Sequence, residues 1–202
     1  VAEADSFTRK GSYKGWEPML LLGTELRGKT FGVVGLGRIG SAVADIMHKG
    51  FGMDIVYFDI KKDKTFEKRV KATFEAVPQL LKKSDIVSIH VPLLDSTHHL
   101  IGARQFRSMK KSALLVNTSR GPVIDEKALV AALKNKTIRG AALDVFEFEP
   151  KLTKGLAKLP NVILTPHTAS ATEEAREAMS LIAAENILAV LSGKKPKYLV
   201  KK

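Results

Sequence analysis

Short apolar runs alternate with amphipathic stretches along most of the chain. Six runs rich in Val, Ile, Leu and Phe predict buried β-strands, at residues 29–34, 54–58, 86–91, 113–118, 140–145 and 162–165. Stretches with apolar residues at helical spacing separate most of these runs and predict helices, at residues 38–49, 74–83, 103–109, 125–135 and 172–191. Strands that alternate with helices predict an α/β fold, a doubly wound parallel sheet of the Rossmann type with helices on both faces.

Polar and glycine residues mark the ends of several predicted helices. Asp125 and Thr172 stand where an N-cap accepts a backbone hydrogen bond, and Gly193 follows the last predicted helix as a C-terminal stop. Pro78 fits within the first turn of a helix or at a kink. The start of the chain does not fit the alternation, and the stretch 12–26 is typical of an arm or linker.

The composition is that of a globular protein, with 45% hydrophobic and 27% charged residues, which excludes disorder and low-complexity architecture. No apolar run approaches the roughly 18 residues of a membrane span, so we expect no membrane segment. The chain has no cysteine, which excludes disulfides, thiol nucleophiles and cysteine-based metal sites, and we expect no metal site. The lack of cysteine suits a reducing compartment, and we predict a cytoplasmic protein.

The formal net charge of +12 is the one unusual figure. It is compatible with binding to nucleic acid, with an anionic ligand or with a solvated lysine-rich surface. The basic residues are scattered, lack interleaved aromatic residues and form no helix-turn-helix or finger pattern. We therefore expect a solvated basic surface and no specific nucleic-acid partner.

The segment 35–40 is a G-x-G-x-x-G motif that follows the first predicted strand and opens the first predicted helix. Gly35 permits the tight turn, Gly37 lets the backbone approach a pyrophosphate, and Gly40 allows close packing of helix on strand. The free N–H groups and the positive dipole end of the helix would face the phosphates. This order of strand, motif and helix predicts dinucleotide binding, against the alternative of a glycine-rich turn without a ligand.

Asp59 ends the second predicted strand, 24 residues after Gly35. This is close to the spacing of about 20 residues for the acid that holds a ribose in such a unit. A carboxylate accepts hydrogen bonds from ribose hydroxyls and repels a 2′-phosphate, so NAD is predicted in preference to NADP. Lys61, Lys62 and Lys64 stand nearby and would either soften this discrimination or belong to a solvated loop, and we predict the solvated loop.

Three polar segments lie at or just beyond the carboxyl ends of later predicted strands, the edge where ligands bind in open α/β sheets, at residues 117–121, 144–150 and 165–170. Arg120 offers a fork of donors to a substrate carboxylate and stays charged at any working pH. His167 can give a proton to an oxygen that becomes an alkoxide as a hydride arrives. Glu149 beside it would orient the ring and favour the imidazolium. Each residue alone is typical of a surface or loop, but together they suit reduction of a carbonyl.

With these motifs in place, the chain resembles the D-isomer-specific 2-hydroxyacid dehydrogenase family. The matching stretches span residues 28–170 and are GKTFGVVGLGRIG, VSIHVPLLDSTHHLIG, LLVNTSRGPVIDEKALVAAL, GAALDVFEFEP and NVILTPHTAS. Within the family, the stretch FTRKGSYKGWEPMLLLGTELRGKTFG is most similar to glyoxylate/hydroxypyruvate reductases. The resemblance implies reduction of a small 2-oxoacid of the glyoxylate or hydroxypyruvate type to the D-2-hydroxyacid with NAD(P)H.

The resemblance also implies a role for individual residues. It implies that Arg120 binds the substrate carboxylate, that His167 is the acid/base with Glu149 as its partner, and that Asp144 lies near the nicotinamide carboxamide. The cofactor contacts that it implies are the pyrophosphate loop with Arg38 and Ile39, the ribose acid Asp59, a stretch along the adenosine and pyrophosphate with Val91, Pro92 and Thr97, and the nicotinamide side with Thr118, Ser119, Arg120, Asp144, His167 and Ala169.

Members of this family begin with a further segment that forms most of a substrate-binding domain. Val1 is not a methionine and the first residues carry no signal-peptide pattern, so we expect that segment to be absent from this chain. We predict a hinge and dimerisation arm at 1–27, a dinucleotide-binding domain at 28–171, and a helix and tail at 172–202 that return toward the absent domain. The resemblance implies a homodimer through the region of Trp16, whose alternative is packing on its own domain.

Two other functions stay open. One is another dehydrogenase of the same family that acts on phosphoglycerate or D-lactate. Formate chemistry is less favoured, because that branch pairs its histidine with Gln and Glu149 is an acid. The other is a non-enzymatic NAD-sensing protein like the corepressors related to this family, which retain the same three residues.

Overall fold

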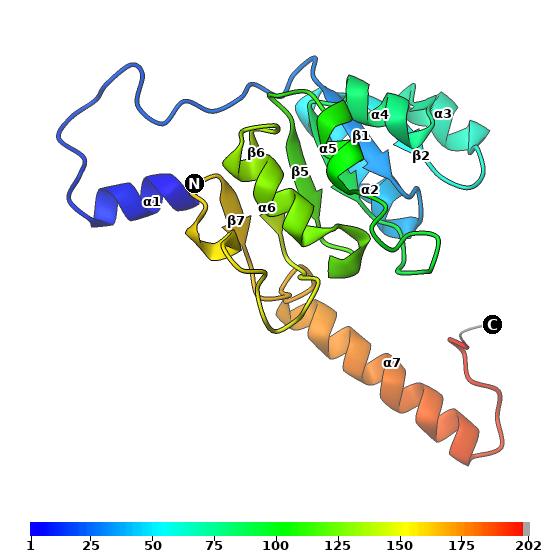
Figure 1. Ribbon diagram of the computed structural model, residues 1–202. Helices are drawn as coiled ribbons and strands as arrows, with labels where there is room; N and C mark the ends of the chain where they lie inside the picture. The colour runs from blue at the N-terminus through cyan, green and yellow to red at the C-terminus, as the bar shows by residue number, and fades with distance from the viewer. Residues whose placement is uncertain (200–202) are drawn as a thin grey trace.

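The computed structural model describes residues 1–199 and confirms the predicted doubly wound α/β fold. Its centre is a seven-stranded sheet in the order β3-β2-β1-β4-β5-β6-β7, in which neighbouring strands are parallel (Figure 1). The strands are β1 (Thr30–Val34), β2 (Asp54–Phe58), β3 (Thr73–Phe74), β4 (Ile86–Ile89), β5 (Leu114–Asn117), β6 (Gly140–Leu143) and β7 (Val162–Leu164). The helices are α1 (Ala2–Arg9), α2 (Arg38–Phe51), α3 (Lys64–Val70), α4 (Val77–Lys83), α5 (Ala103–Ser108), α6 (Glu126–Lys134) and α7 (Glu173–Leu191), with 3-10 turns at Gly121–Val123 and Leu156–Lys158.

The sheet is packed on both faces because successive residues of a strand point to opposite sides. In β1, Phe31 and Val33 join residues of α2 and α3 in one buried cluster. Val34 belongs to a second cluster, with residues of α4, α5 and α6. Gly32 lies on that second side, where a Cβ would come 2.8 Å from Leu80 of α4. Helices on both faces leave the carboxyl edge of the sheet to the loops that follow the strands.

The prediction of six strands missed β3, and the predicted helix 74–83 was wrong at its start. Phe74 lies in β3 and pairs with Tyr57 of β2, whose ring it meets edge-on at 5.4 Å. The helix begins only at Val77. Pro78 lies in its first turn, which is one of the two positions predicted for it. A strand of two residues has no periodicity of its own, so only its pairing with β2 reveals it.

The solvated loop predicted around Lys61, Lys62 and Lys64 is correct only in part, because α3 begins at Lys64. The Asp63 carboxylate accepts a hydrogen bond from Phe66 N at 2.9 Å and caps this helix. All three lysines are exposed as expected, while α3 buries two apolar side chains against the sheet. Two apolar residues among many charges are too few to show a helical pattern.

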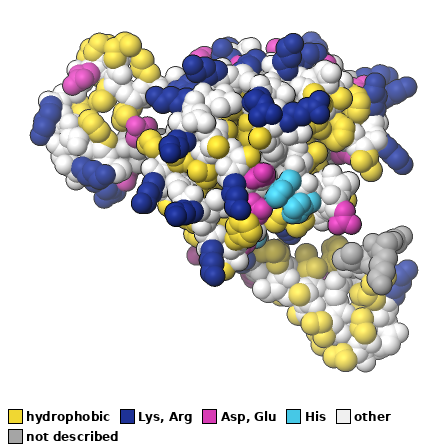
Figure 2. All heavy atoms as spheres, viewed as in Figure 1, with side chains coloured by type: hydrophobic (Ala, Val, Ile, Leu, Met, Phe, Trp, Pro, Cys, Tyr) yellow, Lys and Arg dark blue, Asp and Glu magenta, His cyan; other side chains and the backbone are white. Residues whose placement is uncertain are grey.

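The predicted arm contains an unexpected helix, α1, in which no residue is buried. Trp16 and Met19 farther along are 82% and 76% exposed. Apolar side chains are visible on the arm and on α7 (Figure 2). Helix α7 also buries no residue, and it projects away from the sheet (Figure 1). Its predicted ends are confirmed, because Thr172 Oγ1 accepts from Ala175 N at 3.1 Å and Gly193 has a φ of 70°.

Asp125 is confirmed as the N-cap of α6, since its carboxylate accepts from Ala128 N at 2.9 Å. The predicted tail ends at residues 200–202, which lie outside the described residues. Within residues 1–199, no helix combines the length and hydropathy of a membrane span. Lysine and arginine side chains are dispersed over the face of the molecule that Figure 2 shows.

Candidate active site

The glycine motif forms the loop between β1 and α2, at the carboxyl edge of the sheet (Figure 1). Gly35 has a φ of 98°, and Gly40 packs so closely on the Gly35 carbonyl that no Cβ fits there. At Gly37 a Cβ would meet open space, and no side chain caps the first turn of α2 in the described part of the chain. The first N–H groups of the helix, at the exposed Arg38 and Ile39, are therefore free to bind an anion. This loop fits the pyrophosphate of a dinucleotide.

Asp59 follows β2 and reaches across to the glycine loop. Its Oδ2 accepts a hydrogen bond from Leu36 N at 2.7 Å, and its Oδ1 accepts one from Ile60 N at 2.6 Å. Both oxygens keep lone pairs for further donors such as ribose hydroxyls. The carboxylate borders a hollow of about 540 Å³ whose rim also carries Lys61, Lys62 and Lys64. Negative and positive charge thus meet at the rim of this hollow.

Val91, Pro92 and Thr97 lie in the loop after β4, beside the glycine loop. Val91 N is 2.8 Å from the place that a Cβ on Gly35 would take. Thr97 Oγ1 donates to Pro92 O at 2.6 Å and accepts from Leu94 N at 2.8 Å, so the loop is closed on itself. The structure brings these three residues to the side of the predicted pyrophosphate site.

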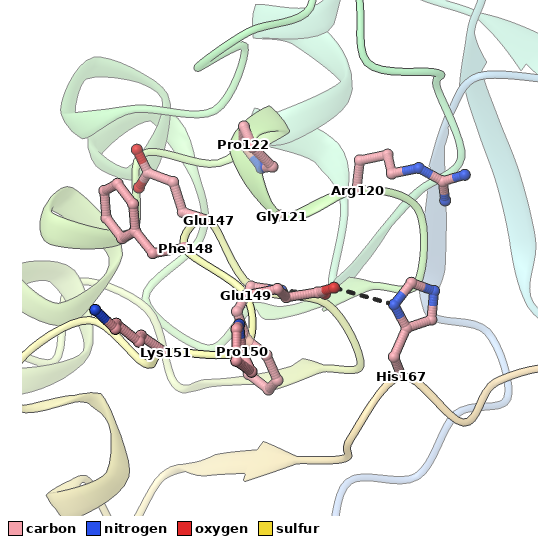
Figure 3. Close-up of a pocket in the computed structure, with 10 residues that line it drawn as sticks. Arg120, Gly121, Pro122, Glu147, Phe148, Glu149, Pro150, Lys151 and His167 are labelled. Carbon is pink, nitrogen blue, oxygen red and sulfur yellow. Dashed lines mark hydrogen bonds and ion pairs between the residues drawn. The ribbon is translucent and has the colours of Figure 1, made fainter.

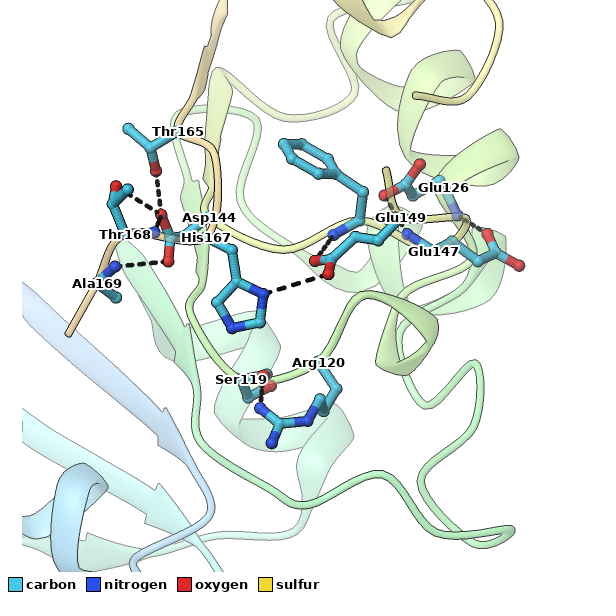
Figure 4. Close-up of polar contacts among 11 residues, drawn as sticks. Ser119, Arg120, Glu126, Asp144, Glu147, Glu149, Thr165, His167, Thr168 and Ala169 are labelled. Atoms are coloured by element: carbon cyan, nitrogen blue, oxygen red, sulfur yellow. Dashed lines mark hydrogen bonds and ion pairs between the residues drawn. The ribbon is translucent and has the colours of Figure 1, made fainter. Parts of the chain in front are cut away.

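Arg120 follows β5 in a turn that Asn117 shapes. The buried Asn117 Oδ1 accepts from Ser119 N at 3.0 Å and from Ser119 Oγ at 2.8 Å, and Asn117 Nδ2 donates to Arg120 O at 3.0 Å. Gly121 completes the turn against the carbonyl group of Phe146, with no room for a Cβ. The Arg120 guanidinium is exposed at the edge, where Nη1 donates to Ser119 O at 2.6 Å (Figure 4).

His167 and Glu149 form a pair in the loops after β7 and β6. His167 Nδ1 lies 3.2 Å from Glu149 Oε2, and Glu149 Oε1 accepts from Phe146 N at 3.0 Å (Figures 3 and 4). Because Nδ1 faces the carboxylate, Nε2 is the ring nitrogen that remains available to another group. The two side chains are 54% and 37% exposed and border, with Arg120, a hollow of about 560 Å³.

Asp144 follows β6 and clamps the turn that carries His167. Its carboxylate accepts from Thr165 Oγ1 at 2.5 Å and from the N–H groups of Thr168 and Ala169, each at 2.8 Å (Figure 4). The turn holds His167 at a φ of 54°, a left-handed conformation that few non-glycine residues adopt. The resemblance implied that Asp144 lies near the nicotinamide carboxamide, and in the structure both its oxygens also serve this turn.

Burial alone would raise the pKa of Asp144, but the hydrogen bonds from Thr165, Thr168 and Ala169 outweigh it, so the pKa lies below its ordinary value of 3.8. Asp144 therefore contributes stability that is complete above about pH 4 and is lost as the pH falls through the folded-state pKa. We expect Asp144→Ala to lower the free energy of unfolding by about 2–3 kcal/mol at neutral pH, since three donors lose a buried charged acceptor.

Urea unfolding of wild type and Asp144→Ala at about pH 7 and about pH 3 measures this effect. The difference between the two proteins should shrink at the lower pH, where the Asp144 carboxyl group of the unfolded wild-type chain binds a proton and that of the folded chain resists it. A difference of equal size at both pH values would show that the charge of Asp144 does not stabilise the turn.

The predicted site residues fall in two groups along one edge of the sheet. The first comprises the glycine loop, Asp59 and the loop after β4, and the second holds Thr118, Ser119, Arg120, Asp144, Glu149, His167 and Ala169. Four residues without a predicted role contact the second group or its loops, and they are Asn117, Gly121, Glu126 and His99. Asn at the end of a strand is typical of a side chain that shapes a turn, and this signal was available for Asn117.

Most of the chain matches a known protein family. The sequence profile of the D-isomer specific 2-hydroxyacid dehydrogenase NAD binding domain matches residues 1–169. The chain is 50% identical to a glyoxylate reductase of Aeropyrum pernix over 99% of its length, and 48% identical to one of Thermococcus litoralis over 100%. It spans only 61% and 62% of these two relatives.

Solved structures match the same fold. The TT0316 protein of Thermus thermophilus superposes with a TM-score of 0.93 at 42% identity, over 100% of this chain and 63% of that one. The NAD-complexed D-isomer specific 2-hydroxyacid dehydrogenase of Lactobacillus delbrueckii ssp. bulgaricus superposes with a TM-score of 0.84 at 35% identity, over 100% of this chain and 64% of that one. The chain therefore belongs to the D-isomer specific 2-hydroxyacid dehydrogenase family and is an NAD-binding domain of that family.

Proposed function

We propose that this chain is the coenzyme-binding part of a reductase that converts a small 2-oxoacid of the glyoxylate or hydroxypyruvate type to the D-2-hydroxyacid. The arrangement of Arg120, Glu149 and His167 around one hollow at the carboxyl edge of the sheet carries the proposal. Relatives named glyoxylate reductase, at 48–50% identity, support this substrate class. Because the chain spans 61% and 62% of those two, we assign the remaining wall of the substrate site to a segment outside it.

In the proposed reaction, Arg120, His167 and Glu149 each have a separate role in reducing the carbonyl. The Arg120 guanidinium binds the substrate carboxylate through parallel N–H groups and orients the neighbouring carbonyl. His167 Nε2 donates its proton to the carbonyl oxygen as that oxygen takes the electron pair of the C=O bond. Glu149 holds Nδ1 and stabilises the imidazolium before the proton leaves. Bound NADH supplies the hydride that reduces the carbonyl carbon.

A panel of 2-oxoacids, measured with NADH and with NADPH on the complete protein, tests the proposal. We expect glyoxylate and hydroxypyruvate to give a higher kcat/KM than pyruvate or a phosphorylated 2-oxoacid. If none of them oxidises the reduced nucleotide, the chain is not part of a 2-oxoacid reductase. Preference for the phosphorylated substrate would assign it to another branch of the family.

We propose NAD as the cofactor in preference to NADP, because the carboxylate of Asp59 would repel a 2′-phosphate. Calorimetry with this chain should find NADH bound about tenfold more tightly than NADPH, which is the scale of one exposed like-charge contact. Asp59→Ala should reduce the difference in affinity between NADH and NADPH, since Lys61, Lys62 and Lys64 stay on the rim of the hollow beside residue 59. Asp54→Ala, at the opposite end of β2, is the matched control and should leave this difference in affinity unchanged. Equal affinities in the wild type would contradict the role of Asp59.

We further propose that the arm joins two copies of the chain. Trp16 and Met19 are 82% and 76% exposed, Tyr13 and Leu22 of the same segment are exposed too, and apolar side chains grouped in this way mark a surface for a partner. Sedimentation at micromolar concentration should show a dimer, and the double variant Trp16→Ser, Met19→Ser should sediment as a monomer. A wild-type monomer at that concentration would contradict this part of the proposal.

A further inference from the structure

A buried acid lies beside the loop that carries Glu149. Glu126, the first residue of α6, is 1% exposed although it carries a carboxylate. Its Oε1 accepts a hydrogen bond from Glu147 N at 2.7 Å, and its Oε2 has no hydrogen-bond partner in the described part of the chain. Burial of a carboxylate is strongly unfavourable unless the carboxylate is paired or hydrogen-bonded. The principal contact here is with the backbone of the loop after β6.

The loop after β6 and helix α6 each donate a backbone hydrogen bond to a glutamate side chain of the other. Glu147 Oε2 accepts from Glu126 N at 3.0 Å, which satisfies a free N–H group in the first turn of the helix (Figure 4). The positive end of the helix dipole favours both carboxylates at this place. Glu147 Oε1 lies 2.7 Å from His99 Nε2, so the loop after β4 joins the same cluster. Gly121, next to Arg120, packs directly on the peptide between Phe146 and Glu147.

The peptide that Glu126 holds is connected to the predicted acid/base pair. The Glu147 N–H belongs to the peptide after Phe146, and Phe146 N donates to Glu149 Oε1 at 3.0 Å. The other oxygen of that carboxylate lies 3.2 Å from His167 Nδ1. A shift of the loop therefore shifts the donor that orients the Glu149 carboxylate, and with it the imidazole ring.

We propose that Glu126 is a positioning residue for the Glu149–His167 pair and acts through the Glu147 N–H. Glu126 does not border the hollow that Arg120, Glu149 and His167 line, and it fixes the loop so that His167 Nδ1 meets the Glu149 carboxylate. The kinetic consequence rests on the proposed function, whereas the effect on the imidazole does not. Misplacement of a reacting group by about 1 Å lowers a rate by as much as about 100-fold.

Three variants separate positioning from a general loss of stability. Glu126→Met removes the acceptor but fills a similar volume, and an apolar side chain is well tolerated where a buried charge is replaced. Glu126→Gln keeps an acceptor oxygen for Glu147 N. Asp125→Ala is the matched control, because it weakens the start of the same helix by removing the cap on Ala128 N and leaves the contact with Glu147 in place.

The ring tautomer of His167, read from ¹⁵N chemical shifts in alkaline buffer on the complete protein, is the first measurement. We expect the Nδ1–H tautomer in wild type, Glu126→Gln and Asp125→Ala, and a shift toward the Nε2–H tautomer in Glu126→Met. The second measurement is 2-oxoacid reduction, where Glu126→Met should lower kcat about 10- to 100-fold and Glu126→Gln should restore it. KM should change less than about twofold, because Arg120 still binds the substrate.

Two results would overturn the proposal. One is a Glu126→Met variant with the tautomer and kcat of the wild type. The other is a Glu126→Gln variant that loses the tautomer, since Gln keeps the acceptor that the proposal requires. If no protein in the series reduces a 2-oxoacid, the proposed function fails, and the tautomer alone still decides whether Glu126 positions the pair.

Discussion

Replacement of His167 by alanine in the complete protein is expected to lower kcat by about 10²–10⁴, the usual contribution of a positioned general acid. Without the imidazole, the oxygen that gains the electron pair must take its proton from water. KM should change little, because Arg120 still binds the substrate carboxylate. Steady-state kinetics with glyoxylate and NADH measures both quantities.

Two further variants show whether the loss belongs to the proton donor. His48→Ala removes a histidine near the far end of α2, where Nδ1 lies 2.9 Å from Met53 O, and should keep wild-type kcat. Glu149→Gln keeps an acceptor for Nδ1 but removes the negative charge beside the imidazole, so its kcat should fall, though by less than that of His167→Ala. A His167→Ala variant with the wild-type rate would place the proton donor elsewhere.

The 202-residue chain by itself is expected to bind NADH but to reduce 2-oxoacids at least about 10²-fold more slowly than the complete protein, the order lost with one contact to a developing oxyanion. Its site residues are open to solvent in the described part of the chain. Arg120 is exposed, and the side chains of His167 and Glu149 are 54% and 37% exposed. Water around the carboxylate and the developing alkoxide weakens both contacts, and closure that excludes water needs a second wall.

Oxidation of NADH with glyoxylate and with hydroxypyruvate, followed for the chain and for the complete protein, measures this loss. Calorimetry with NADH serves as the control, since a chain that binds the nucleotide has its glycine loop folded. Turnover by the chain within about tenfold of the complete protein would show that Arg120, Glu149 and His167 need no second wall.

The sequence predicts most of the sheet because six of its strands are continuous apolar runs bounded by turns. The glycine loop is predictable in detail for a similar reason, since the demands on Gly35 and Gly40 come from neighbouring backbone. Strand β3 and helix α3 escape prediction because two residues, or two apolar side chains among charges, carry no pattern. Their place is set by packing on β2, which no local signal reports.

In the candidate site, the sequence does not predict the contacts between residues that lie far apart along the chain. The pair of Glu149 and His167 is predictable from the order of segments along the carboxyl edge and from the family resemblance. The hydrogen bonds that Asp144 accepts from the His167 turn join residues more than 20 positions apart, as do the hydrogen bonds between Glu126 and Glu147. Each depends on the exact packing of two loops, so spacing along the chain contains no signal for it.

Transfer of deuterium from NADH labelled at both positions of nicotinamide C4 to the substrate carbon tests the proposed reaction most directly. Glycolate made from glyoxylate by the complete protein should carry one deuterium at C2, because Arg120 would orient the carbonyl toward the hydride that bound NADH supplies. Mass spectrometry of the product reads the label. Unlabelled glycolate would contradict hydride transfer from the bound nucleotide, and glyoxylate and hydroxypyruvate both left unchanged beside labelled NADH would contradict the assignment of this chain to a 2-oxoacid reductase.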